Sequence, residues 1–291
     1  MNDRYLAAAA GLLLGLLAGP VQASPQRPWQ TDVEGALATA KAEDRLLLVD
    51  LSAEWCGWCR VLEREVFPDP AFVAATRDFV LLRVDVEDGD EGSRLAARHG
   101  VDSLPRLLVL EPSGARAGEV NGYAPVDQFL ARLEAVLAVR ERRLESYRRT
   151  LASGDAEALR RTAVDFYGRR DGERAAALLE RLLEVARLEP AGETWARVLL
   201  ADSWRLAGRA DAARLAAERA REASKQSGPL DEVIEEKLDL LDFWIAETSG
   251  ECGSAVGALA AFGRAHPHSL YLGEARDALA QLRSAAGERC S

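Results

Sequence analysis

The sequence of 291 residues has few cysteines, fewer basic than acidic side chains and few long apolar runs, and each of these features argues against a class of protein. With only four cysteines, it is not a small domain held together by many disulfides. Acidic side chains outnumber basic ones by 47 to 37, and the net charge of −10 argues against a surface that binds nucleic acid. Beyond the N-terminal segment, no apolar run is long enough to cross a membrane. The length is sufficient for two domains.

The longest apolar run lies at the N-terminus. Arg4 precedes it, and Val21-Gln22-Ala23 offers the small residues at which a secretory leader is cleaved. Glycines interrupt the run and leave it short for a membrane anchor, which is the alternative interpretation. We therefore predict that residues 1–23 are a signal peptide and that the mature protein is periplasmic or secreted. Disulfides persist in such a compartment.

Two cysteines separated by Gly-Trp are the most informative feature. Cys56 and Cys59 follow an apolar run of strand length, residues 46–51, and precede a helical segment, residues 61–67. A strand that turns into a helix leaves free backbone N–H groups at the start of the helix, and these groups favour a thiolate. Cys56 would then be the attacking thiol, and Cys59, one turn further on, would resolve the mixed disulfide.

The same spacing also occurs in structural disulfides and in zinc sites. A zinc site needs two further ligands at matching spacing, but the other candidates lie far away in the sequence. They are Cys252, Cys290, His99, His266 and His268. A Cys-x-x-Cys between a strand and a helix favours redox use, so we predict neither a metal nor another cofactor.

The segment 49–60 resembles the active-site segment of the thioredoxin family, and the resemblance extends from about Trp29 to Leu137. Leu104-Pro105 precedes a second apolar run, where the family has its cis-proline. The Gly-Trp dipeptide is most similar to periplasmic thioredoxin-like reductases. The resemblance implies an α/β thioredoxin fold, a mixed sheet with helices on both faces, and a dithiol that exchanges with the disulfides of protein substrates.

The resemblance also implies a role for an acid in the first strand. Asp50 matches the acid that the family buries beside the second cysteine. Burial raises the pKa of a carboxyl group, so Asp50 could accept the proton of Cys59. The alternative is an acid at a strand end that faces water. Arg83 matches a lysine near that acid, and because an arginine keeps its proton it could only pair with Asp50 or stay on the surface.

Four residues are predicted to bind the substrate. In this family the residue before the cis-proline, here Leu104 before Pro105, offers its backbone to the substrate chain as an added strand. Trp55 and Trp58 flank the cysteines, and either could instead be a packing residue. We expect partial packing for Trp55, and exposure on a docking surface for Trp58.

After residue 140 strand signals vanish, and alanine, leucine, arginine and glutamate dominate. A weak repeat near residues 200–220 and 243–267 is similar to the tetratricopeptide pattern. We predict a thioredoxin-like domain over 24–139 and an all-α, tetratricopeptide-like helical domain over 140–291, which would dock a protein partner or dimerise. The basic run 140–149 is predicted to be a solvated linker helix.

Two cysteines remain in the helical half. Cys252 lies in a glycine-rich turn and Cys290 beside the C-terminus. We predict that they pair and close the last repeat, which would contribute about 3–4 kcal/mol in the loop-entropy model. The alternative is a second redox relay that receives electrons from Cys56 and Cys59.

The resemblance and the predicted signal peptide together imply an exported thiol–disulfide oxidoreductase that reduces protein disulfides. A reductase outside the cytosol must itself be reduced again, which implies a membrane electron donor. A disulfide oxidant or isomerase in oxidative folding would use the same residues. A third hypothesis is a redox-inert scaffold that works through the helical domain. The intact cysteine pair, Asp50 and Pro105 argue against this third hypothesis.

Overall fold

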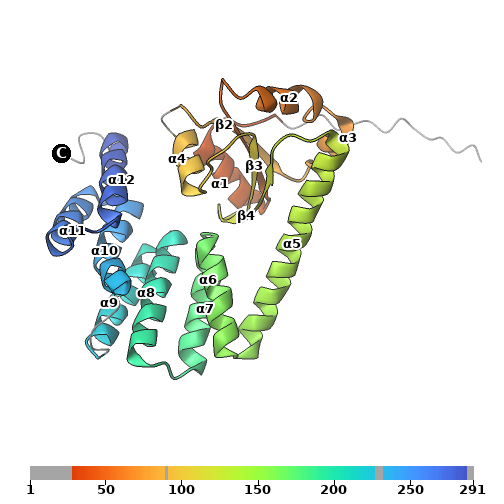
Figure 1. Cartoon of the computed structure of the whole chain (residues 1–291). Helices are drawn as coiled ribbons and strands as arrows, with labels where there is room; N and C mark the ends of the chain where they lie inside the picture. Colours follow the sequence, from red (N-terminus) through yellow and green to blue (C-terminus); the bar gives the residue numbers. More distant parts are fainter. Residues whose placement is uncertain (1–27, 89–90, 227–231, 287–291) are drawn as a thin grey trace, which may run out of the picture.

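The computed structural model describes residues 28–88, 91–226 and 232–286 (Figure 1). The N-terminal part is a mixed sheet with helices, and the C-terminal part is an array of helices. The long helix α5 (Val126–Ser153) joins the two parts. Both predicted fold classes are thus confirmed. Among the described helices, none has the length and apolarity that a membrane span requires.

The sheet has four strands in the order β2-β1-β3-β4. Their bounds are β1 (Leu47–Ser52), β2 (Val80–Asp85), β3 (Arg106–Leu110) and β4 (Arg116–Asn121). Strand β1 runs parallel to β2 and antiparallel to β3, which is antiparallel to β4. The central strands β1 and β3 are almost entirely buried. Their sequences are apolar at consecutive positions because successive side chains point to opposite faces of the sheet, and both faces are covered by helices.

Helices cover both faces of this sheet, as predicted. They are α1 (Val33–Glu43), α2 (Gly57–Glu65), α3 (Pro70–Ala75) and α4 (Glu91–Arg98), together with the first half of α5. One apolar core contains Leu62 of α2, Phe72 of α3 and Phe129 of α5. The other contains Ala36 of α1 and Leu95 of α4. The sheet is therefore covered on both faces, with the start of α2 at one end of β1.

The C-terminal array consists of seven helices within the described residues. They are α6 (Ala156–Gly168), α7 (Gly172–Val185), α8 (Pro190–Leu206), α9 (Ala210–Ser224), α10 (Glu232–Thr248), α11 (Cys252–Ala265) and α12 (Tyr271–Ala286). Consecutive helices pack on one another around one continuous core and a smaller C-terminal core. Gly172 permits the close approach of α7 to α8, since a Cβ there would lie 2.2 Å from the carbonyl oxygen of Ser203.

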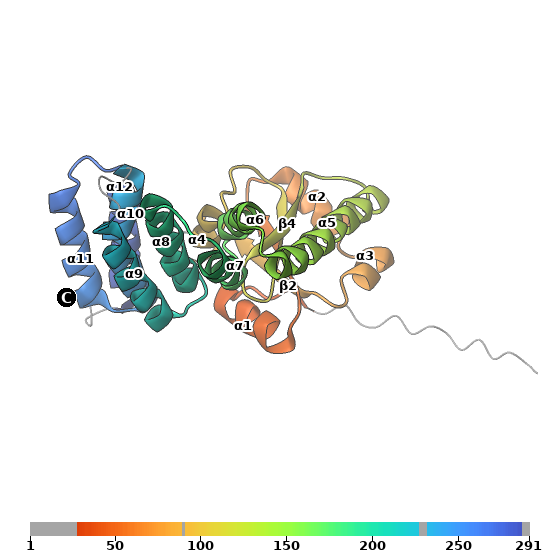
Figure 2. The same ribbon diagram turned by 90° about the horizontal axis from the view of Figure 1, so that it is seen from below.

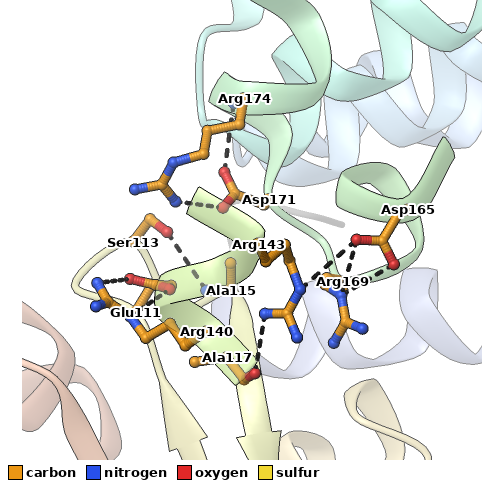
Figure 3. A network of polar contacts seen from close by, with 10 residues as sticks. All are labelled: Glu111, Ser113, Ala115, Ala117, Arg140, Arg143, Asp165, Arg169, Asp171 and Arg174. Atoms are coloured by element: carbon orange, nitrogen blue, oxygen red, sulfur yellow. Dashed lines mark hydrogen bonds and ion pairs between the residues drawn. The ribbon is translucent and has the colours of Figure 1, made fainter. Parts of the chain in front are cut away.

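The predicted boundary between residues 139 and 140 falls inside α5, a single helix of 28 residues. The prediction of a solvated helix over 140–149 is wrong for Arg140 and Arg143, whose side chains are 17% and 13% exposed. The two arginines lie where α5 passes the end of the sheet (Figure 3). The basic run looks solvated in sequence because its partners come from distant parts of the chain.

These partners join the helical array to the sheet (Figure 3). Arg140 Nε and Nη2 each donate a 2.8 Å hydrogen bond to the carboxylate of Glu111, which is buried just after β3. Arg143 Nη1 donates to the carbonyl oxygen of Ala117 in β4 at 3.1 Å. The backbone N–H of Arg116 donates to the carbonyl oxygen of Arg169, just after α6, at 2.9 Å. The array thus contacts the sheet directly, in addition to the covalent link through α5.

Candidate active site at the start of α2

Cys56 and Cys59 form a disulfide whose Cα atoms are 5.3 Å apart. Cys56 is the N-cap of α2, and its Sγ accepts the N–H of Cys59 at 3.2 Å. The chain reaches this position through a turn in which the N–H of Cys56 donates to the carbonyl oxygen of Ala53 at 3.0 Å. The first cysteine therefore lies at the positive end of the helix dipole, where a thiolate is stabilised.

The cysteines are nearly covered, with exposed fractions of 3% for Cys56 and 1% for Cys59. Ala53, Val86 and Leu104 pack against them. The Leu104–Pro105 peptide bond is cis, as predicted from the resemblance. The structure thus places the cis-proline loop against the disulfide, although the two elements are separated by half of the α/β part.

Asp50 is completely buried in the middle of β1, so the prediction of burial is confirmed and the alternative of a water-facing acid is wrong. Burial raises the pKa of the Asp50 carboxyl group to about 6. Arg83, its neighbour in register on β2, opposes this shift by donating from Nε to Asp50 Oδ2 at 2.8 Å. The other carboxylate oxygen, Oδ1, is buried without a hydrogen-bond partner among the described residues.

Arg83 is held by contacts that the sequence did not indicate. Its guanidinium group lies over the rings of Trp29 and Phe67, at 5.0 and 5.4 Å from the ring centroids. Its Nη1 is 3.5 Å from Glu63 Oε1. Glu63 belongs to α2, one turn after Cys59, so Arg83 links the buried acid of the sheet to the cysteine helix. The sequence predicted no role for Trp29, which was named only as the start of the segment that resembles the thioredoxin family.

Aromatic side chains surround the disulfide at the surface. Trp58 is 60% exposed, as predicted, and stacks on Tyr123 with ring centroids 5.2 Å apart. Trp55 is 62% exposed, so the prediction of partial packing is wrong. Its indole N–H donates to Glu87 at 2.7 Å. Tyr123 was missed because it is distant in sequence, and it donates from its hydroxyl group to Glu65 of α2 at 2.8 Å.

The remaining candidate residues lie away from this site. Within the described part of the chain, no group of three or more His, Cys, Asp and Glu side chains could hold a metal ion. His266 lies 2.9 Å from Asp239, and His99 is buried after α4. Cys252 is buried at the first residue of α11. Cys290 lies outside the described residues, so its pairing with Cys252 stays a prediction.

A Cys-x-x-Cys disulfide at the start of a helix, beside a cis-proline loop on a mixed sheet, defines the site as one of the thioredoxin class. Residues 28–112 match the family model described as thioredoxin-like, so this part of the chain is a thioredoxin-like domain. The match ends before α5 and the helical array.

Among curated proteins, the thiol:disulfide interchange protein DsbD of Pseudomonas fluorescens is 35% identical over 104 residues, and DsbD 2 of Pseudomonas aeruginosa is 38% identical over 107. These segments cover 35% and 36% of this chain but only 18% of each relative. Among solved structures, a thioredoxin from Thermus thermophilus is 29% identical, with a TM-score of 0.35 over 38% of this chain and 88% of that one.

Proposed function

We propose that the protein is a thiol–disulfide oxidoreductase that reduces disulfides of protein substrates through Cys56 and Cys59. The observation that carries this proposal is the disulfide at the start of α2, with the N–H of Cys59 directed at Cys56 Sγ. The relatives named above as thiol:disulfide interchange proteins support it, over the segment that they share with this chain.

In the dithiol form, the Cys56 thiolate attacks one sulfur of the target disulfide. A Cys56–target disulfide forms, the target S–S bond breaks, and the second target sulfur leaves as a thiolate that takes a proton from water. Cys56 is assigned the attack because its sulfur caps the helix, where the backbone N–H groups favour negative charge. Cys59, in the first turn of α2, donates its N–H to Cys56 Sγ and follows in the second step.

Asp50 is assigned the proton transfer of the second step. Its carboxylate accepts the proton of the Cys59 thiol, and the Cys59 thiolate then attacks Cys56 Sγ. The bond between Cys56 and the first target sulfur breaks, this first sulfur leaves as a thiolate that takes a proton from water, and the Cys56–Cys59 disulfide results. Two electrons have passed from the dithiol to the target. A pKa raised to about 6 suits this role, because the carboxylate is then both ionised at neutral pH and basic enough to accept a proton.

The substrate is proposed to bind across Leu104 and Pro105, with Trp55 and Trp58 as the docking surface. Leu104 packs against the cysteines, so a chain paired with its backbone would bring its disulfide next to Cys56. The exposed indoles of Trp55 and Trp58, which flank the cysteines in the sequence, supply apolar area for docking.

We further propose that the protein works outside the cytosol and is re-reduced by a membrane electron donor. The proposal rests on the N-terminal sequence, which lies outside the described residues, and on the oxidising conditions that an exported dithiol would meet. The helical domain is proposed to dock a protein partner, because stacked helix pairs present an extended surface.

The experiment is the reduction of insulin by the fully reduced protein, followed by turbidity and by thiol counts. Cys56→Ser should abolish the reaction, and Cys59→Ser should accumulate a mixed disulfide that is visible on a non-reducing gel. Glu54→Gln, an exposed neighbour of the site, is the matched control and should leave the rate unchanged. Full activity of the Cys56→Ser protein would contradict the proposed mechanism.

A further inference from the structure

A group of cations lies where α4 of the thioredoxin-like domain meets the helical array. In both views α4 lies beside the ends of α7 and α8 (Figures 1 and 2). Arg98 is the last residue of α4, Arg170 follows α6, and Lys237 belongs to α10. None of these three side chains forms an ion pair with a carboxylate of the described residues. In a chain with an excess of acids, three unpaired cations near one junction require an explanation.

Asp202 is the acid that acts electrostatically on Arg170 and Lys237, and it already has other close partners. Asp202 of α8 lies 2.5 Å from Arg205 Nε, and it also accepts the hydroxyl group of Tyr167 at 2.5 Å. Arg205 lies in turn over the ring of Trp244, 5.8 Å from its centroid. The carboxylate of Asp202 thus has two close partners, and Arg170 and Lys237 stay outside its hydrogen-bond range.

The positive charge acts on its neighbours. Burial lowers the pKa of the Arg170 guanidinium group, and Arg205 and Arg98 lower it further. Burial lowers the pKa of His99 to about 3, with additional contributions from Arg170, Arg98 and Arg116. The imidazole Nε2 of His99 is buried without a hydrogen-bond partner among the described residues. Asp202 and Tyr167 oppose the lowering of the Arg170 pKa, and Lys237 helps to lower the pKa of Asp202, so this one carboxylate offsets part of the positive charge.

Aromatic rings hold one of the cations in place. Lys237 Nζ lies 5.9 Å from the ring centroid of Tyr167 and 5.8 Å from that of Tyr271. Such rings orient an ammonium group without removing its charge. Elements α4, α6, α10 and α12 all contribute, so the group extends across both parts of the chain.

The partial negative charges at helix C-termini compensate only part of the positive charge of these three residues. Arg98 and Arg170 lie at the C-terminal ends of α4 and α6, and each end carries about half a negative charge. Two such ends do not balance three full positive charges. A multiply charged anion would, and the net charge of −10 argues against nucleic acid as that anion.

We propose that Arg98, Arg170 and Lys237 form a binding site for an acidic segment of a partner polypeptide. Guanidinium groups bind carboxylates in a bidentate way, and the spread over several helices suits an extended chain with several acids rather than one small ion. The site is independent of the redox chemistry proposed above, and its test needs no disulfide exchange.

The test is the binding of fluorescein-labelled hexaglutamate to the oxidised full chain, measured by fluorescence anisotropy at low and moderate salt. We expect saturable binding that weakens with salt, and a loss of about tenfold in affinity for Arg170→Gln. Arg98→Gln and Lys237→Gln should each weaken binding by a smaller factor. Arg160→Gln is the matched control, because this exposed arginine of α6 pairs with Glu157 within its own helix.

Three results would overturn the proposal. They are no binding of hexaglutamate by the unmodified protein, equal affinity for the Arg170→Gln and Arg160→Gln proteins, and displacement by inorganic phosphate at a concentration no higher than that of glutamate peptide. If Arg170→Gln fails to fold, Arg98→Gln decides, because Arg98 is exposed. Cys56→Ser should bind hexaglutamate as the unmodified protein does, so failure of the redox proposal would leave this result unaffected.

Discussion

Arg83 Nε donates a 2.8 Å hydrogen bond to Oδ2 of Asp50, the completely buried acid of β1. The guanidinium group of Arg83 also lies over the rings of Trp29 and Phe67, which hold its side chain beside the acid. Burial and the arginine act on the acid in opposite directions, and burial has the larger effect. The result is an acid whose pKa lies near 6, and two predictions follow from that value.

The first prediction concerns the rate at which the mixed disulfide is resolved. Asp50 accepts a proton only when it is ionised, so the rate should rise with pH around a midpoint near the pKa of about 6. Asp50→Asn should slow the step on the order of 100-fold at pH 7 and remove this midpoint. Rapid-quench trapping of the mixed disulfide measures both effects. The exposed Asp78→Asn variant should keep the unmodified profile, and a midpoint that survives in Asp50→Asn would rule out the assignment.

The second prediction concerns stability. The pKa of Asp50 is raised from 3.8 to about 6 in the folded state, so the folded protein binds a proton that the unfolded chain has already lost between these values. Stability therefore falls as pH rises from about 4 to 6, by about 3 kcal/mol if this group acts alone. The Asp50→Asn protein should not lose stability over this pH range, because the amide does not titrate. Thermal unfolding at pH 4 and pH 7 should show a larger drop in Tm for the unmodified protein, and equal drops would contradict the pKa.

A third prediction concerns the contact between the two parts of the chain. Arg140→Met leaves the buried Glu111 carboxylate without its bidentate partner, which typically costs about 3–5 kcal/mol. We expect a lower Tm and faster proteolysis of α5. Adding Glu111→Gln should recover much of the loss, because the buried charge is then removed. Arg142→Met is the control on the exposed side of the same helix. A Tm of Arg140→Met equal to that of this control would show that the ion pair does not stabilise the junction.

A fourth prediction concerns Trp58 as part of the docking surface. Trp58→Ala removes an exposed indole and its stacking on Tyr123, so KM for a protein disulfide should rise by about five- to tenfold. The rate with a small disulfide should change little, because a small substrate can reach Cys56 without contacting the docking surface. Leu270→Ala, a 95% exposed residue of the helical array, serves as the control. Equal losses for large and small substrates would indicate that Trp58 acts on the chemistry instead.

The sequence allowed the prediction of the elements that are local or carried by the family resemblance. The strand–helix junction at Cys56, the burial of Asp50 and the cis bond before Pro105 all belong to this group. What could not be predicted depends on contacts between distant segments. Trp29, Phe67 and Arg83 are distant in the sequence, and the two rings contact Arg83 only in the folded structure.

The basic run of α5 illustrates the same limit. Its alternating charges are typical of a solvated helix, and the pattern holds no information about what lies opposite. Arg140 and Arg143 are covered because the end of β3, strand β4 and helix α6 lie against this part of α5. Trp55 shows the reverse case: an indole next to the cysteines was expected to pack, yet the turn before α2 directs it to solvent.

The reduction potential of the Cys56/Cys59 pair in the mature protein tests the central claim most directly. The pair would be equilibrated with dithiothreitol or glutathione buffers, and thiol counts would be taken alongside tryptophan fluorescence. The account predicts a reversible two-electron couple near that of thioredoxin, about −270 mV. A value near about −120 mV would make the protein an oxidant, and a pair that does not cycle would contradict the enzyme itself.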